Sequence, residues 1–321
     1  MAFVQAGAEL MDMLAAAVRE HGDMNQFAQL SPEQQIDAAR HWDIFALAGL
    51  AGLGPQTAET AKTIVQDRVY AVLAHLVAPP DRLMRVMRDT KTVLADRHIH
   101  AIIHPDQPPA TENFLFHSPA VHWRTFCIFF LDVLHAKEVT DRDEIERVRG
   151  DDAGPGFEEY AVLVLNGRKI VITESNPFSP LEAVPWKKAT NYMNVLSSRC
   201  IYIAYPWLMQ SKRGRIREDV EDRMGRRWRR QGWNLRKTFR AIGTHHADCL
   251  DGDLCPQKIR YLGDENTLVL LYDCDADAYP EDSVTVMWVL GGQPCGTDNC
   301  HTEIVRQVGL ATLEEAQEER N

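Results

Sequence analysis

The sequence predicts an α+β protein in which a helical N-terminal subdomain precedes a mixed sheet body with antiparallel hairpins. With 321 residues, 45% of them hydrophobic, the chain is long enough to bury a large core. Apolar residues recur at helical spacing before residue 95, and β-branched runs with turn signals appear after residue 160. We therefore expect three regions: a helical subdomain at 1–95, an α/β body at 96–245, and a Cys/His-rich hairpin region with a C-terminal tail at 246–321.

Four helices are expected in the first region. The first spans residues 3–20, with an apolar stripe and Gly22 as its stop. The second begins at Ser31, which is followed by a proline and a glutamine in a capping-box pattern, and runs to the glycines at 52 and 54. The third ends at the prolines at 79 and 80, and the fourth begins at Asp81 and continues through Leu94.

The clearest strand signal is a hairpin at residues 160–173. Two apolar runs flank Asn166 and Gly167, a dipeptide that supplies the positive φ angles of a two-residue turn. Residues 267–272 and 283–290 are expected to form a second antiparallel pair around an acidic loop. Between the hairpins, residues 188–196 and 215–240 are expected to be helical.

Composition and charge limit the location and the partners. A formal net charge of -11 disfavours a general nucleic-acid or anionic-membrane binder unless the basic residues are gathered in one place. No apolar run reaches the roughly 18 residues needed to span a bilayer, and Glu9 and Asp12 interrupt the apolar core that a secretion signal would need. We expect a cytoplasmic protein without a membrane segment, whose seven cysteines are reduced or bound to metal rather than joined as a disulfide framework.

A set of short motifs carries a family resemblance. They are the strand at 168–175, Ser-Pro-Leu-Glu-Ala-Val at 179–184, Asn-Tyr-Met-Asn-Val at 191–195, Ala-Tyr-Pro-Trp-Leu at 204–208, and the cysteine motifs at 246–249 and 254–256. In this order, and over about residues 90–262, the chain resembles uncharacterised fungal proteins that look like divergent members of the nucleotidyltransferase-like fold. The resemblance implies a nucleotidyltransferase-like mixed sheet for the body.

The chain departs from that fold where its chemistry would lie. Nucleotidyl transfer needs a Gly-Ser turn for the triphosphate and an Asp-x-Asp pair on one face of a strand for magnesium. The equivalent region, about residues 102–122, has no Gly-Ser, and its acids Asp106 and Glu112 are not two residues apart. Phe114, Leu115 and Phe116 occupy the expected metal-binding strand. We therefore predict a degenerate, inactive site.

Five of the seven cysteines follow residue 245, together with several histidines. Zinc prefers four thiolate or imidazole ligands brought together as two close pairs. The candidate ligands are Cys249, Cys255, Cys295, Cys300 and His301. Their spacing is looser than Cys-x-x-Cys, so a zinc site, a pocket of unligated thiols and disulfides all remain open. Cys127 and Cys200 lie among aromatic and aliphatic residues and are expected in the core.

The same segment matches a second metal pattern more weakly. His246, Asp248 and His301, with Arg306 after them, follow the ligand order of the 2-His-1-carboxylate iron site of 2-oxoglutarate oxygenases. The jelly roll of those enzymes needs about eight strands, whereas only four strands are legible here. An iron oxygenase is therefore the weaker hypothesis.

Residues 212–240 form a strongly basic segment in an otherwise acidic chain. They include twelve basic and four acidic residues, a net charge of +8, so that the rest of the chain carries -19. The candidate binding residues are Arg223, Arg226, Arg227, Arg229, Arg230, Trp228 and Trp233. Arginine beside tryptophan suits phosphate contact and base stacking. The alternative is that this helix docks on the acidic surface of its own chain or of a neighbouring subunit.

Together these observations favour a non-catalytic binding or assembly protein, for example a structural component of a larger particle. The expected partner is another protein or a second copy of the chain. Nucleic acid bound through the basic helix is an alternative. The enzymatic alternatives are a divergent nucleotidyltransferase and a non-haem iron 2-oxoglutarate-type oxygenase.

Overall fold

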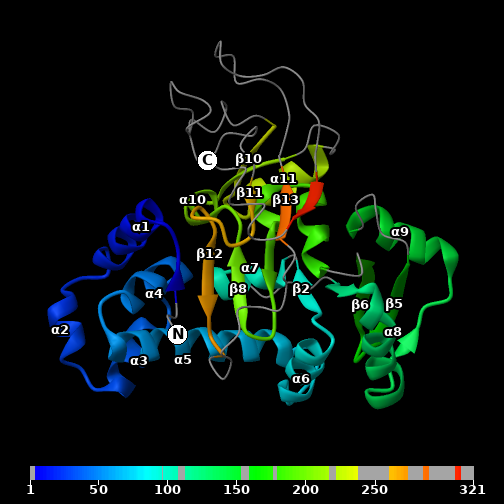
Figure 1. Ribbon diagram of the computed structural model, residues 1–321, viewed down its shortest axis with the longest axis horizontal. Helices are drawn as coiled ribbons and strands as arrows, with labels where there is room; N and C mark the ends of the chain where they lie inside the picture. Colours follow the sequence, from blue (N-terminus) through cyan, green and yellow to red (C-terminus); the bar gives the residue numbers. More distant parts are fainter. Residues whose placement is uncertain are drawn as a thin grey trace, which may run out of the picture.

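The computed structural model describes residues 4–95, 97–107, 113–152, 159–175, 179–216, 222–237, 260–273, 285–288 and 308–311. It is a mixed α/β structure built around a large sheet. Figure 1 shows helices α1 (Ala8–Arg19) to α4 (Ile44–Ala51) at one end of the molecule. The hairpin of β5 (Tyr160–Leu165) and β6 (Arg168–Ser175) lies at the other end, with further strands between them.

The N-terminal region contains more helices than expected. Besides α1 and α4, residues 4–90 form α2 (Met24–Ala28), α3 (Pro32–Ala39), α5 (Pro55–Ala74) and α6 (Asp81–Asp89). The capping box at Ser31 and Gln34 is present and starts α3 as predicted. The expected second helix is nevertheless two helices, because the Asp43 carboxylate accepts a hydrogen bond from Ala46 N at 2.8 Å and starts α4 anew.

The large sheet has nine strands in the order β1-β12-β8-β7-β2-β3-β6-β5-β4. Besides β5 and β6, they are β1 (Val4–Gln5), β2 (Val93–Ala95), β3 (Phe114–Pro119), β4 (Lys137–Glu138), β7 (Asn194–Leu196), β8 (Cys200–Ile203) and β12 (Leu268–Leu271). Among these strands, β3 and β6 pair in parallel and every other neighbouring pair is antiparallel. A second sheet has three strands in the order β11 (Arg260–Tyr261), β13 (Thr285–Trp288) and β14 (Val308–Ala311), and it is not hydrogen-bonded to the large sheet.

Strand β2 corrects the prediction that the fourth helix continues through Leu94. Helix α6 ends at Asp89, and Lys91 takes a positive φ of 53° that a continuing helix does not allow. The chain then enters the sheet between β7 and β3. A segment expected to be helical thus supplies a central strand.

The predicted hairpin at 160–173 is confirmed. Tyr160 pairs with Thr173 and Leu165 with Arg168, and the turn residues Asn166 and Gly167 have φ values of 52° and 75°. The second predicted pair is wrong as a pair. Strand β12 lies between β1 and β8 in the large sheet, whereas β13 lies between β11 and β14 in the small one.

The expected helix at 188–196 is also wrong. This stretch contains a bridge at Ala189, the 3-10 turn η3 (Thr190–Tyr192) and strand β7. Its apolar residues, among them Val195 and Leu196 of β7, are buried in the core, and such residues favour a strand when a sheet partner is available. Tertiary pairing therefore overrides the local pattern.

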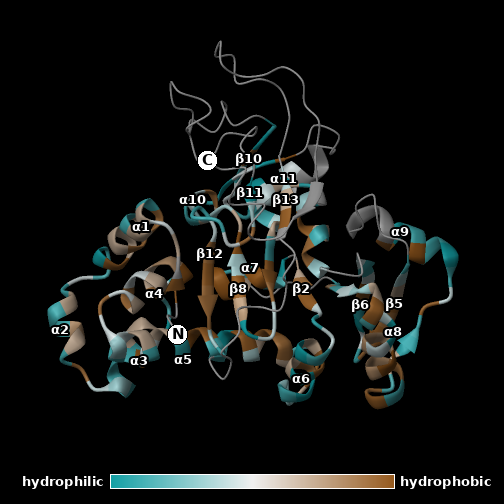
Figure 2. Cartoon of the chain, viewed as in Figure 1, coloured by the Kyte–Doolittle hydropathy of each residue, from teal (hydrophilic) through white to brown (hydrophobic). Residues whose placement is uncertain are grey.

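Alternate residues of the strands separate two hydrophobic layers. In β12, Leu268 and Leu270 join the core formed with the N-terminal helices, whereas Val269 and Leu271 pack on the opposite face. The second face is covered by η2 (Pro180–Trp186), α10 (Pro206–Gln210) and the small sheet, through Val184, Leu208 and Trp288 among others. Figure 2 shows the apolar colouring of the central strands. Both faces are covered, which explains why β2, β3 and β8 are buried throughout.

Further helices complete the described fold. Helix α7 (His98–Ile103) follows β2, α8 (Ala120–Ile128) continues into the π-helical turn η1 (Phe129–Val133), and α9 (Arg142–Asp152) precedes the hairpin.

Cys127 and Cys200 are buried, as predicted, and burial raises the pKa of the Cys127 thiol to about 12. None of the helices within the described residues has both the length and the apolar character needed to cross a bilayer.

Candidate partner-binding site

The described residues of the basic segment form three short elements, which corrects the expectation of one helix over 215–240. They are β9 (Arg213–Arg215), α11 (Asp222–Arg230) and β10 (Asn234–Arg236). Helix α11 ends because Gly232 takes a φ of 83°, and Trp233 N then donates a hydrogen bond back to Trp228 O at 3.0 Å. The chain returns as β10, which pairs in parallel with β9.

The two tryptophans of this segment are buried. Trp228 and Trp233 are each 2% exposed, and their rings meet at right angles with centroids 5.4 Å apart. The His100 ring lies 5.1 Å from each of them. Because both rings are covered, they anchor the segment to the protein body. Both are candidate binding residues by sequence, and in the structure their rings are covered by the protein body.

The arginines of α11 lie opposite this anchor. At about 100° per residue, Arg226, Arg229 and Arg230 fall within one third of the helix circumference, and Trp228 falls on the other side. All three arginines are exposed. We call these three residues the arginine face. Arg223 and Arg227 belong to the same helix, but their side chains lie outside the described part of the structure.

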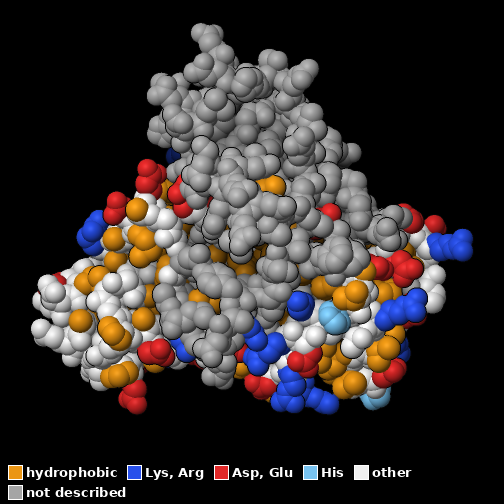
Figure 3. Space-filling model, viewed as in Figure 1, with side chains coloured by type: hydrophobic (Ala, Val, Ile, Leu, Met, Phe, Trp, Pro, Cys, Tyr) orange, Lys and Arg blue, Asp and Glu red, His pale blue; other side chains and the backbone are white. Residues whose placement is uncertain are grey.

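The arginine face has no ion-pair partner within the described residues. Other cations do: Lys212 Nζ lies 3.0 Å from Asp106 Oδ2, and Lys169 Nζ lies 2.5 Å from Glu144 Oε1. Arg229 Nε instead donates to Gly225 O on its own helix at 3.3 Å. Figure 3 shows acidic and basic side chains together on the described part of one molecular face. Asp222 begins the same helix one turn before Arg226, and its side chain lies outside the described part of the structure. Among the described side chains of α11, this surface carries three arginines and no carboxylate, in contrast to that mixed pattern.

Tyr192 connects the anchor to the rest of the protein. Its hydroxyl oxygen accepts hydrogen bonds from Trp228 Nε1 at 2.6 Å and from Arg97 Nε at 2.8 Å. The Arg97 guanidinium also lies 5.4 Å from the centre of the Trp228 ring and 5.5 Å from that of Tyr192. Arg97 at the start of α7 and Trp228 of α11 thus converge on the phenol of Tyr192 in η3.

Two buried histidines, His100 in α7 and His104 at its C-terminal cap, lie beside the rings of Trp228 and Trp233. His100 Nε2 lies 2.6 Å from Asn191 O, and His104 Nε2 lies 3.2 Å from Met209 O, so each ring nitrogen is assigned as the donor. Burial, together with the neighbouring His100 and Lys212, lowers the pKa of His104 to about 4. The His104 side chain is therefore neutral at physiological pH.

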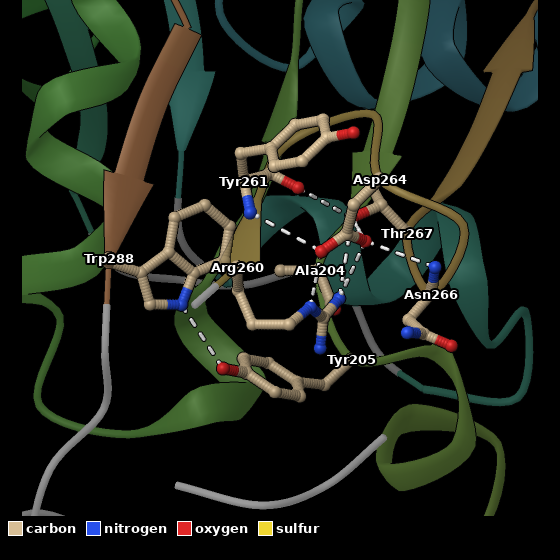
Figure 4. A network of polar contacts seen from close by, with 8 residues as sticks. All are labelled: Ala204, Tyr205, Arg260, Tyr261, Asp264, Asn266, Thr267 and Trp288. Atoms are coloured by element: carbon tan, nitrogen blue, oxygen red, sulfur yellow. Dashed lines mark hydrogen bonds and ion pairs between the residues drawn. The ribbon is translucent and has the colours of Figure 1, made fainter. Parts of the chain in front are cut away.

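A second polar network holds the residues that lead into the basic segment (Figure 4). Arg260 and Asp264 form a buried ion pair, with Arg260 Nε 2.5 Å from Asp264 Oδ2. Arg260 also donates to Ala204 O at 2.8 Å, and its guanidinium lies 4.8 Å from the centre of the Tyr205 ring. Tyr205 caps α10, which leads directly into β9. We interpret this network as scaffold, since it fixes the start of the chain segment that carries the basic residues.

The predicted metal ligands belong to the part of the chain after residue 245. Cys249, Cys255, Cys295, Cys300 and His301 lie outside the described residues, as do the iron-site candidates His246, Asp248 and Arg306. Within the described residues, no three His, Cys, Asp or Glu side chains are arranged to hold a metal ion. Zinc therefore stays a prediction, which metal analysis of the purified protein would test.

Sequence reasoning missed the partners of the basic segment. Arg97 and His100 are each about 130 residues from Trp228, and Tyr192 is 36 residues from it. No local motif links them. A weak signal existed in the three histidines at 98, 100 and 104, which are unusual in an otherwise apolar stretch.

Comparisons with known proteins add no relative. No family model, no curated protein and no solved structure matches this chain. Fold and site together define a mixed α/β protein that presents an arginine-bearing helix anchored by buried aromatic side chains. The function has to be argued from that site.

Proposed function

We propose that this chain is a non-catalytic binding protein that holds an anionic partner on the arginine face of α11. One observation carries the proposal: Arg226, Arg229 and Arg230 are exposed side by side, with no described carboxylate opposite them. Like charges three and four residues apart on a helix repel by a few tenths of a kcal/mol per pair. A bound anion removes that repulsion.

The anchoring of α11 supports a role as a presented surface. A helix of nine residues is too short to be stable alone. Trp228 and Trp233 fix it through the contacts with Tyr192 and His100, while the charged side is left to solvent. The structure therefore orders the arginines before a partner arrives, which lowers the entropy cost of binding.

The non-catalytic part of the proposal rests on strand β3. Phe114, Leu115 and Phe116 are fully buried where the resemblance to nucleotidyltransferases would require metal-binding carboxylates. Asp106 is engaged by Lys212, and Glu112 lies outside the described residues. The nucleotidyltransferase-like ancestry and the absence of nucleotide transfer both remain proposals.

Charge reversal on α11 tests the binding role. We expect R226E/R229E/R230E to elute from a heparin column at clearly lower salt than the wild type. The salt dependence of its affinity should fall by roughly 2–3 in logarithmic slope, about 0.9 per contact. The control R82E/R85E/R124E reverses three exposed arginines on α6 and α8, and it should bind like the wild type.

Two results would contradict the proposal. Failure of the wild type to bind any polyanion at low salt would remove the function. Equal losses in the two triple variants would show that total charge, rather than the arginine face, controls binding. Circular dichroism of both variants verifies that they are folded. A change of mass in solution for R226E/R229E/R230E alone, without polyanion present, would instead identify a second copy of the chain as the partner.

A further inference from the structure

We propose that the anionic partner is double-helical nucleic acid, held through its phosphate backbone and without base stacking. This inference rests on the proposed function and deepens it, because it names the class of ligand. It follows from three features of the described residues: the aromatic rings are buried, the positive charge is dense, and the helix is exposed on one side.

The first step concerns aromatic rings. Proteins that hold single-stranded nucleic acid stack bases on exposed aromatic side chains, each worth about 1–3 kcal/mol. The aromatic residues in the described part of the basic segment are Trp228 in α11 and Trp233 between α11 and β10, and both are 2% exposed. Trp228 is further held by its hydrogen bond to Tyr192. The described part of the segment therefore offers charge without a stacking platform.

The second step concerns the density of charge. Side chains three and four residues apart on a helix start about 5–6 Å from one another, so the arginine face is a compact group of three cations. Duplex DNA carries one negative charge per about 1.7 Å of its axis. The carboxylates of an acidic protein surface are spaced more widely and mixed with neutral groups. The duplex thus supplies anions at the density that the arginine face requires, and guanidinium groups bind phosphate in bidentate geometry.

The third step concerns shape and reach. An α-helix with its side chains is about 10–12 Å across, which the roughly 12 Å wide major groove of a duplex admits. The flanking strands add exposed cations at Arg213 and Arg236. Gly225 occupies the position before Arg226 and is open on its outer side, with no atom within 4 Å of the place of a Cβ. Phosphates can therefore approach the helix closely there, and we expect little preference for base sequence.

The test compares three polyanions by fluorescence anisotropy at several salt concentrations. They are a labelled 20-base-pair DNA duplex, one of its strands alone, and polyglutamate of matched charge. The duplex should bind at least about fivefold more tightly than the single strand, since no stacking energy of 1–3 kcal/mol per base favours the strand. A second duplex of unrelated sequence should bind within about twofold of the first, because backbone contacts carry no sequence information.

Each outcome has a distinct meaning. A single strand that binds as tightly as the duplex overturns the inference while leaving an anion-binding protein. Polyglutamate that binds as tightly as the duplex also overturns it and indicates an acidic protein partner. If none of the three binds, the proposed function itself fails. The variant R226E/R229E/R230E should lose the duplex affinity, and the control R82E/R85E/R124E should retain it.

Discussion

At the scale of single residues, one phenol holds the basic helix in place. The Tyr192 hydroxyl is the common acceptor for Trp228 of α11 and for Arg97, which immediately precedes α7. Tyr192 is 5% exposed, so water has little access to replace either hydrogen bond. A donor that loses its acceptor in such a place keeps its full desolvation cost, about 1–3 kcal/mol.

Substitution of Tyr192 by phenylalanine should therefore lower both stability and binding. We expect the free energy of unfolding in urea to fall by about 1–3 kcal/mol, because Trp228 Nε1 and Arg97 Nε both lose their acceptor. Affinity for heparin should fall as well, since α11 is no longer fixed. The comparison variant is Tyr70→Phe at a half-exposed tyrosine of α5, whose side chain hydrogen-bonds Gln66 and Asp81. Water can replace those contacts there, so the change should stay below about 1 kcal/mol. Equal effects at the two sites would show that the phenol has no special role.

The buried histidine beneath the segment predicts a pH dependence. The pKa of His104 is about 4 in the folded protein, against 6.5 for an unperturbed histidine. The unfolded chain therefore binds more protons between these values. The stability that the neutral, buried His104 contributes is complete above pH 6.5 and is lost as the pH falls toward 4, by at most about 3 kcal/mol.

This prediction is measured as a difference between variants. Urea unfolding of the wild type and of His104→Gln at several pH values between 7 and 4 should show a shallower loss of stability in the variant. Glutamine keeps an N–H that can donate to Met209 O but does not titrate. Parallel pH profiles for the two proteins would show that His104 does not titrate with a lowered pKa.

At the scale of elements, local signals predicted what local forces determine. The hairpin at 160–173 and the cap at Ser31 were readable, because a turn dipeptide and a capping box each specify their own geometry. Strand β2 was not readable, since its three residues pair with β3 and β7, which are distant in sequence. Strand β7 forms a hairpin with the neighbouring β8, but its three residues are too few to give a strand pattern. The arginines of the candidate site could be named from sequence alone. Helical periodicity alone places Trp228 opposite them, but the burial of Trp228 against Tyr192 and His100 depends on residues distant in sequence, which no local pattern predicts.

Glycine at the crossing of α1 and α4 gives a prediction at this scale. A Cβ added at Gly49 would lie 2.1 Å from Leu14 O and 3.1 Å from Val18 Cβ, which is incompatible with the present distance between the helices. Gly49→Ala should therefore lower the free energy of unfolding by about 1–3 kcal/mol or more. Gly225→Ala is the matched control in α11, where a Cβ meets nothing within 4 Å. It should raise stability by about 0.5–1 kcal/mol, and a gain from both substitutions would contradict the close approach of α1 and α4.

At the scale of the whole molecule, the large sheet draws on all three regions expected from the sequence. Region 1–95 supplies β1 and β2, region 96–245 supplies β3 to β8, and region 246–321 supplies β12. Strand β12 lies inside the sheet, paired with β1 on one side and β8 on the other. Its flanking residues add further links, since Asp273 pairs with Arg88 and the Tyr272 hydroxyl donates to Ser197 O. The described sheet therefore joins the beginning, the middle and the end of the chain.

A truncation after residue 245 should consequently fail to fold cooperatively. It removes β12, so that Leu268 and Leu270 leave the core formed with the N-terminal helices and Val269 and Leu271 leave the opposite layer. It also removes Arg260 and Asp264, which fix the start of α10 and thereby the basic segment. A shorter truncation, ending at residue 311, keeps every described strand and serves as the control. We expect a single sharp unfolding transition in urea for the control and a broad one, with early proteolysis, for the fragment 1–245. A cooperative transition of the fragment with retained heparin binding would show that the region after residue 245 is an independent addition, whatever its strands contribute to the sheet.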